Sequence, residues 1–518
     1  LIQALAKSRL LGMVGVFLFF VGMVLLGNLV GYSHPLLQFG LVGGAIADVA
    51  APLSDMNGSG RFVIGGYWLR AYGAATAVLV VLLTYLLWNR GTLQPLIYRA
   101  RSLTARSNRW IYSAASLAIL LAIGTGGYIF YNMNVLNEYI TEDKLNEKKA
   151  EYERRHRDHL SLPMPTRIDV VSEVDIYPDR KRVESRATET LRNDTNEEIS
   201  TVHLVFPLGL QVAGMSLEGA TLTSQEGDFN YSIFDFDTPM LPGEERMLFY
   251  ETVIQVRGFE HRNPKLDVVQ NGSYLLNEEI GPHIGFDTQK VIFDQNLRAK
   301  FGLDPLPDLI EPTDSSASGG GFFGNSLDWV RLDATVSTVA SQVAVAPGDL
   351  LEEWRDGDRR YFRYRADTPI VDLYPYASAE YEIISDQWND VNIDVYYHPA
   401  HGRNVGRMID SARDSLDYFS RNFSPYQYTH LRIVETPAFQ GSAQGWPGMI
   451  TVSEQAGFIT RPRSEIGIID GSYLVVAHEI AHQWWANQVM PALAKGHEML
   501  TEALASYSAL LVAENEYG

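Results

Sequence analysis

Three long apolar segments alternate with polar loops in the first quarter of the chain. Residues 10–32, 71–88 and 111–131 contain no charged side chain and are rich in Leu, Val, Ala and aromatic residues. A helix needs roughly 20 apolar residues to cross about 30 Å of hydrocarbon. The pattern therefore predicts three transmembrane helices within a membrane region formed by residues 1–131.

The loops between these segments predict their orientation, because Lys and Arg are retained on the cytoplasmic side of a membrane. Five arginines and no acidic residue lie between the second and third segments, whereas residues 33–66 contain two Asp and one Arg. We therefore expect a multi-pass protein of the cell's inner membrane. Everything that follows residue 131 should be extracytoplasmic.

A densely charged stretch follows the third apolar segment. Residues 132–165 are rich in Glu, Lys and Arg and contain few apolar positions, and Pro163 and Pro165 end the stretch. Proline blocks helix continuation and favours extended backbone in the preceding residue. We expect a charged helical linker here, a solvated stalk between the membrane and a following domain.

Short alternating runs replace the long apolar segments from residue 166 onward. Runs such as IDVVSEVDIYP and MLFYETVIQV have the period of two and the β-branched content of strands, and Asp, Asn, Gly and Pro separate them. This pattern predicts a mostly antiparallel β domain over residues 166–384.

Charge and composition exclude several classes of function. The 518 residues carry a formal net charge of −20, with a net of +7 in residues 1–131. A nucleic-acid-binding protein needs basic surface to neutralise phosphates, so a nucleic-acid partner is not expected. The chain contains no Cys. Any metal must therefore be held by His and carboxylate ligands.

The motif His-Glu-x-x-His occurs once, as His478, Glu479 and His482 in the run YLVVAHEIAHQWWANQVMP. Two histidines four residues apart on a helix share one face, so both imidazoles can reach one tetrahedral Zn²⁺ ion. Glu479 would sit beside the metal and could act as general base toward a water molecule there.

A catalytic zinc site needs a third protein ligand. Pro491 should halt the first helix, Gly496 permits a turn, and a second helical pattern then follows, so a helix could return antiparallel with Glu502 facing the histidines. Glu498 is the rival ligand. It lies at the expected helix start, where an acidic residue ordinarily serves as a cap or dipole partner. The geometry favours Glu502.

The segments HEIAHQWWANQV and MLTEALASY resemble the zinc motif of the aminopeptidase N family of gluzincin metallopeptidases. The resemblance implies that His478, His482 and Glu502 bind Zn²⁺ and that Glu479 is the general base. It also implies that the β domain precedes a thermolysin-like α/β catalytic domain, here residues 385–518 and incomplete. The tyrosine that stabilises the oxyanion in this family, and its helical domain, would lie beyond residue 518, so we expect the chain as given to be inactive alone.

One family element is altered. The strand that carries Gly-x-Met-Glu-Asn in this family corresponds to FQGSAQGWPGMITVSE, residues 439–454, which lacks the expected Glu. In the family that Glu recognises the free amino terminus of the substrate, so this part of the resemblance does not extend to strict exopeptidase specificity. Gln440, Gln444 and Trp446 are either cleft residues or ordinary edge-strand side chains.

A second resemblance is seen in the apolar segments, and the run YIFYNMNVLNEY at the end of the third segment is the part that shows it. They resemble the permease of an ABC exporter fused to an aminopeptidase-like domain, with the chain a fragment at both ends because it begins at Leu1 and stops at Gly518 within a helical pattern. No phosphate-binding Gly-x-x-x-x-Gly-Lys-Ser/Thr loop occurs, so an ATPase would be a separate subunit.

These features lead to two functional hypotheses. The first is a membrane-anchored zinc metallopeptidase, aminopeptidase-like, that hydrolyses peptide bonds. The alternative is an exporter permease component whose peptidase-like domain binds or hands over peptides without cleaving them. A scaffold with a structural zinc fits less well, because structural zinc sites are closed by four protein ligands and no fourth is evident.

Overall fold

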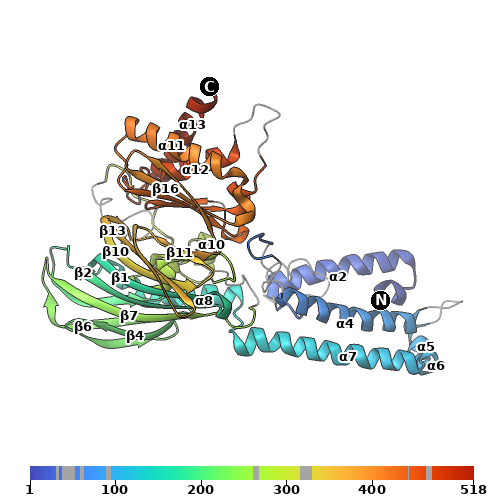
Figure 1. Ribbon diagram of the computed structural model, residues 1–518. Helices are drawn as coiled ribbons and strands as arrows, with labels where there is room; N and C mark the ends of the chain where they lie inside the picture. The colour runs from blue at the N-terminus through green and yellow to red at the C-terminus, as the bar shows by residue number, and fades with distance from the viewer. Residues whose placement is uncertain are drawn as a thin grey trace. The chain divides into compact units, whose positions relative to one another are not determined.

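The computed structural model describes residues 1–30, 34–37, 53–58, 64–88, 95–260, 268–314, 329–441, 443–461 and 470–518. The chain divides into two compact units (Figure 1). The helical unit comprises Leu1–Pro52, Ser59–Glu147 and Arg257–Lys265. The sheet unit comprises Leu53–Gly58, Lys148–Val256 and Leu266–Gly518. The six residues Leu53–Gly58 thus belong to the sheet unit although the helical unit flanks them in sequence.

The helical unit is built from the predicted apolar segments. Its helices are α1 (Ile2–Leu5), α2 (Arg9–Val30), α4 (Ile64–Leu87), α5 (Leu96–Arg101), α6 (Leu103–Arg106) and α7 (Arg109–Phe130), and a π-helical turn at Tyr131–Leu136 continues α7. Helices α4 and α7 pack together and bury Leu69, Ile129 and Met133. The guanidinium of Arg99 is buried and donates hydrogen bonds to the carbonyl oxygens of Ala4 and Leu87, at 2.7 and 3.0 Å.

Two helices in the described residues are long and apolar enough to cross a membrane. They are α4 and the continuous helix Arg109–Leu136, and most of their side chains are not buried. The described apolar part of the first predicted span, Arg9–Leu25, is shorter. The end of that predicted span, residues 31–32, lies outside the described residues.

The charged linker is helical, but the prediction of a solvated stalk is wrong for its second half. Helix α8 (Glu142–His156) buries Tyr152, Glu153 and His156. The ring of Tyr152 stacks on Phe286, with centroids 5.1 Å apart. Both Glu153 carboxylate oxygens accept hydrogen bonds from the Arg298 guanidinium, at 2.6 and 2.8 Å. The sequence pattern does not reveal this docking. A charged residue that is buried against a partner far away in the sequence has the same local pattern as a solvated charged residue.

Replacing Glu153 with Ala should strongly destabilise the sheet unit. The change leaves the Arg298 guanidinium, whose side chain is 1% exposed, without its carboxylate partner. Loss of one member of a buried ion pair costs about 3–5 kcal/mol. Glu151, in an exposed pair with Arg155, provides the control, and its replacement should cost less than about 1 kcal/mol. Denaturant unfolding followed by tryptophan fluorescence measures both, and equal costs would contradict the docking.

Three sheets form the strand-rich part of the sheet unit. The largest has the strand order β12-β13-β10-β1-β2-β7-β4, a second has the order β5-β6-β3-β9 and a third has the order β11-β14-β8. All pairings are antiparallel except that of β1 with β10, which is parallel. The predicted, mostly antiparallel character is therefore observed.

The strands of these sheets have the following bounds: β1 (Thr166–Tyr177), β2 (Arg182–Arg192), β3 (Ile199–Val205), β4 (Gln211–Leu217), β5 (Ala220–Glu226), β6 (Tyr231–Met240), β7 (Glu245–Gln255), β8 (Ser273–Leu276), β9 (His283–Ile284), β10 (Trp329–Val339), β11 (Val343–Val345), β12 (Asp349–Asp356), β13 (Arg359–Val371) and β14 (Pro375–Ala379). Two short helices, α9 (Asn277–Ile280) and α10 (Gln295–Lys300), lie between β8 and β10 in the chain.

The C-terminal part of the sheet unit is a mixed sheet with packed helices. Its strand order is β15 (Glu382–Trp388), β16 (Val391–Tyr397), β17 (His430–Thr436), β19 (Met449–Ser453) and β18 (Ala443–Trp446). The pairs β16–β17 and β17–β19 are parallel. Helices α11 (Val405–Asn422), α12 (Gly471–Ala481) and α13 (Leu504–Tyr517) share one apolar core with this sheet. Strand β15 crosses the predicted domain boundary between residues 384 and 385.

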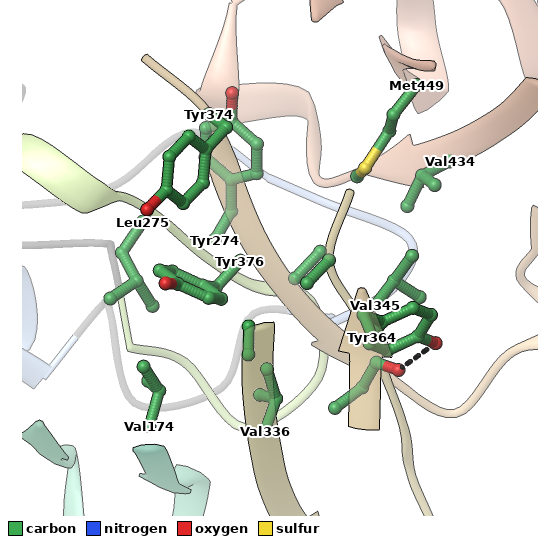
Figure 2. Close-up of a cluster of buried hydrophobic side chains, with 14 of the residues drawn as sticks. Val174, Tyr274, Leu275, Val336, Val345, Tyr364, Tyr374, Tyr376, Val434 and Met449 are labelled. Atoms are coloured by element: carbon green, nitrogen blue, oxygen red, sulfur yellow. Dashed lines mark hydrogen bonds between the residues drawn. The ribbon is translucent and has the colours of Figure 1, made fainter. Parts of the chain in front are cut away.

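One apolar core connects the antiparallel sheets with the mixed sheet. Figure 2 shows Val434 and Met449, from β17 and β19, beside buried side chains of the antiparallel strands such as Val345 and Tyr364. The Tyr364 hydroxyl donates a hydrogen bond to the Ala344 carbonyl oxygen at 2.9 Å. Because this core is continuous, the antiparallel sheets support the mixed sheet, against which helices α11, α12 and α13 pack.

Candidate metal centre

Helix α12 positions the first two candidate ligands. The Asp470 carboxylate caps its start by accepting hydrogen bonds from the backbone N–H groups of Ser472 and Tyr473. Val476 and Ile480 are fully buried in the core that α12 shares with α11 and α13. This packing fixes the rotation of the helix about its axis.

The helix ends at Ala481, well before Pro491, so the expectation that Pro491 halts it is wrong. Tertiary contacts end it earlier, because the chain turns to bury Trp484 against Phe419, with ring centroids 5.3 Å apart. His482 lies at the helix end, and its Nδ1 is 3.0 Å from the Trp485 carbonyl oxygen. That contact favours a proton on Nδ1 and leaves Nε2 free to bind a metal.

The structure brings the three predicted ligands together. The Nε2 atoms of His478 and His482 are 3.2 Å apart. The Glu502 carboxylate oxygens lie 3.4 Å from the Nε2 of His478 and 3.6 Å from that of His482. Ligand atoms at 2.0–2.1 Å from a tetrahedral zinc ion would be about 3.3–3.4 Å from one another. The donor set therefore fits Zn²⁺ in both chemistry and spacing.

Glu502 reaches the histidines from a π-helical turn at Met499–Ala503 that leads directly into α13. Helices α12 and α13 pack together, as the predicted hairpin requires. The rival Glu498 is the residue that precedes this turn, and its carbonyl oxygen accepts a hydrogen bond from the Thr501 hydroxyl. Among the described residues, Glu502 and not Glu498 completes the cluster of potential metal ligands with His478 and His482.

Glu479 and His478 line a cavity of about 390 Å³. The Glu479 side chain is nearly buried, with 6% of the residue exposed. Burial, assisted by the negative charge of Glu502, raises the pKa of Glu479 to about 8. Burial and the neighbouring His482 lower the pKa of His478, which favours the neutral imidazole that binds metals. Two neighbouring carboxyl groups and two imidazole rings are the kinds of ligand that a divalent cation such as Zn²⁺ takes.

The cavity is otherwise lined mostly by small and apolar side chains: Ala443, Ala456, Leu474, Val475, Ser506, Ala509 and Leu510. Ser506, which sequence reasoning did not single out, places its Oγ 3.4 Å from the Nδ1 of His478. Only the fold could identify it, since α13 brings it back to α12. The lining is therefore mostly apolar beside His478 and Glu479.

The three residues left open as cleft residues lie elsewhere. Trp446 is buried and its indole N–H donates a hydrogen bond to the Thr451 hydroxyl at 3.1 Å. The side-chain oxygen of Gln444 is 3.5 Å from the Tyr274 hydroxyl. Neither they nor Gln440 are among the residues that line the described cavity.

Gly445 is the residue of this strand that meets the metal centre. A Cβ atom at Gly445 would lie 2.6 Å from the Glu479 carbonyl oxygen and 2.7 Å from the Cβ of His482. Strand β18 therefore approaches the zinc-motif helix by its backbone, and no side chain fits at this point. A glycine inside a strand is a signal for such close approach, and sequence reasoning did not use it.

Replacing Gly445 with Ala should push β18 away from α12 and disturb the ligand His482. Overpacking of this kind costs about 1–3 kcal/mol. We expect a lower unfolding free energy together with weaker zinc binding, measured by denaturant titration and by competition with a chromogenic chelator. Gly227, around which no atom lies within 4 Å of an added Cβ, is the matched control. If both alanine variants bind zinc like the parent chain, the contact has been misassigned.

Comparison with known proteins agrees with this geometry. Residues 407–518 match the family model of the peptidase family M1 domain. Over 138 residues the chain is 30% identical to probable aminopeptidase 1 of Sulfurisphaera tokodaii, which covers 26% of this chain and 17% of that protein. Over 158 residues it is 30% identical to aminopeptidase N of Canis lupus familiaris, which covers 28% of this chain and 16% of that protein.

An M1 zinc metallopeptidase from Deinococcus radiodurans is similar in structure, with a TM-score of 0.48 and 17% identity over 69% of this chain and 72% of that one. The matched part of this chain spans less than a fifth of the length of either sequence relative. The family match includes all three candidate ligands and Glu479. Residues 407–518 thus resemble the peptidase family M1 domain, and the relatives named above are described as aminopeptidases and a zinc metallopeptidase.

Proposed function

We propose that this protein is a membrane-anchored zinc metallopeptidase that hydrolyses peptide bonds at the centre formed by His478, His482 and Glu502. The observation that carries the proposal is the mutual spacing of the three ligands, 3.2 to 3.6 Å between the closest donor atoms, which suits one tetrahedral zinc ion. Three protein ligands leave one coordination position open, as catalytic rather than structural zinc sites do.

The side chains have separate roles in this proposal. Zinc, when bound, acts as a Lewis acid that polarises a carbonyl group and lowers the pKa of water. Glu479 takes the proton of the attacking water and passes it to the leaving amine. Its burial supports this role, because it raises the pKa of the carboxyl group to about 8 when the metal is absent and so makes the carboxylate a stronger base. The cavity beside Glu479 would hold the peptide next to this carboxyl group.

Membrane anchoring is assigned to α4 and the helix Arg109–Leu136. The chain order supports an extracytoplasmic catalytic domain. Residues Leu53–Gly58, between α2 and α4, belong to the sheet unit, and so does the chain after Glu147. If these helices cross a membrane, both connections must therefore lie on the side of the sheet unit. The arginine-rich connection between α4 and α7 then lies on the opposite, cytoplasmic side.

The permease resemblance and a separate ATPase subunit stay predictions, because the family match begins at residue 407 and does not extend to the apolar helices. The alternative function, peptide binding without hydrolysis, is not adopted. The matched relatives named above are described as aminopeptidases. Residues 439–454 lack the Glu that recognises a free amino terminus in the resembled family, so we do not restrict the proposed substrates to peptides with a free amino terminus.

Metal removal tests the proposal directly. The complete protein in detergent should bind one Zn²⁺ per chain and hydrolyse members of a peptide panel that includes amino-terminally blocked peptides. A chelator should abolish hydrolysis, and Zn²⁺ should restore it, because no other described group in the cavity supplies an electrophile. Bound zinc without turnover of any peptide would instead support the peptide-binding alternative.

A further inference from the structure

Residues Leu53–Gly58 form a turn that is held by Glu454, which directly follows β19, and by Asn271, which precedes β8. The backbone N–H groups of Asp55 and Met56 donate hydrogen bonds to the Glu454 carboxylate, at 3.0 and 3.2 Å. The Met56 carbonyl oxygen accepts a hydrogen bond from the Asn271 side chain at 2.9 Å, and the Asn57 side chain exchanges two hydrogen bonds with the Asn271 backbone. These six residues thus make five hydrogen bonds to the rest of the sheet unit.

The turn is also anchored by an apolar side chain. Met56 is 5% exposed and belongs to the continuous core that joins the antiparallel sheets with the mixed sheet. A Cβ at Gly272, whose φ is +95°, would lie 3.3 Å from the Met56 Cε and 2.5 Å from the Pro437 Cγ. Met56 therefore fills a tightly packed position next to the start of the 438–440 turn.

Glu454 is the junction between this turn and the metal centre. The residue is 1% exposed and directly follows strand β19. Besides the two N–H groups of the interhelix turn, its carboxylate accepts the N–H of Ala438 at 3.0 Å. Ala438 begins the short helical turn that leads to β18, where Gly445 contacts Glu479 and His482. A single buried carboxylate thus fixes both the interhelix turn and the chain that enters β18.

Two other buried side chains, His401 and Glu435, lie close enough to Glu454 to suggest a second metal site. Their polar atoms already have partners. Glu435 binds the Nδ1 of His401 at 2.5 Å and accepts the His398 N–H at 2.6 Å, while three N–H groups surround Glu454. The carboxylates of this cluster accept hydrogen bonds from N–H groups of the chain. We therefore infer that the cluster holds the turn Leu53–Gly58 and does not bind a cation.

We propose that Leu53–Gly58 is a latch, and that the surface around Glu454 and Asn271 is its receptor. When the latch is docked, Glu454 holds the 438–440 turn and thereby keeps β18 against α12, so that His482 stays in place for zinc. Glu454 is then a positioning residue for the metal centre, and zinc retention depends on a segment that is continuous in sequence with the apolar helices α2 and α4. The effect of the latch on zinc retention rests on the proposed zinc site. The contacts between the latch and its receptor do not depend on that site.

The test uses the complete chain in detergent with Met56→Ala and Glu454→Gln, and with Met247→Ala as the matched control because Met247 is 52% exposed on β7. Hydrogen exchange is measured by mass spectrometry for peptides that cover residues 53–58 and 436–446. The rate of zinc loss is measured by transfer to a chromogenic chelator. Neither measurement requires hydrolysis.

The latch predicts that Met56→Ala accelerates exchange about tenfold or more in both peptides, since local opening exposes both segments together. Zinc loss should also be faster. Glu454→Gln keeps the side-chain size but replaces one acceptor oxygen with a donor, so it should reproduce both effects even if Met56→Ala does not fold. Met247→Ala should change neither.

Faster exchange confined to residues 53–58, with unchanged zinc loss, would overturn the latch. So would equal effects of Met56→Ala and Met247→Ala. If the parent chain binds no zinc, the proposed function fails instead, and the exchange of residues 436–446 in Met56→Ala still decides whether the latch exists.

Discussion

Replacing Glu479 with Gln is expected to lower kcat of the complete protein by about 100- to 10,000-fold, the usual contribution of a positioned general base. The amide has nearly the same shape as the carboxyl group but cannot accept the proton of water. Zinc should remain bound at one ion per chain, because His478, His482 and Glu502 are unchanged. The loss should appear in kcat rather than in KM, since the substrate cavity keeps its lining.

Peptide hydrolysis and metal content are measured on the same preparation. Glu498→Gln provides the control, as Glu498 lies on the neighbouring turn and is absent from the ligand cluster. It should retain both activity and zinc. If the Glu479 variant kept most of its turnover, another group would have to serve as the base and the assigned mechanism would fail.

Replacing Glu502 with Ala is expected to weaken zinc binding by more than about 100-fold. Loss of a group that only supports a metal ligand costs 10- to 100-fold in affinity, and loss of a direct ligand should cost more. The remaining site would hold zinc through two imidazoles, and Glu502 is the only described acid with an oxygen within 4 Å of both Nε2 atoms. Zinc affinity is measured by competition with a chelator of known affinity.

Glu498→Ala decides between the two acids that the sequence offered. It should leave zinc affinity unchanged, because Glu498 does not belong to the cluster of potential metal ligands formed by the described residues His478, His482 and Glu502. The reverse outcome, with zinc lost from the Glu498 variant and kept by the Glu502 variant, would show that the turn at Met499–Ala503 adopts a different register when the metal is bound.

Local spacing in the sequence was enough to find the chemistry of this site. His478, Glu479 and His482 lie within one helical turn and a half, so their relative directions follow from the geometry of the helix alone. Glu502 required one further step, the return of a second helix, which Gly496 and the helical pattern after it supplied. The apolar segments and the alternating strand runs were visible for the same reason, since their signals are local periodicities.

Contacts between distant segments were decided only by the tertiary structure. The sequence predicted a solvated stalk where α8 buries Glu153 against Arg298, 145 positions away, and it placed the end of the zinc-motif helix at Pro491, whereas burial of Trp484 ends it at Ala481. The docking of Met56 beside Glu454 joins residues 398 positions apart. Such pairings leave no periodic trace, because each partner taken alone has the pattern of an ordinary loop or surface residue.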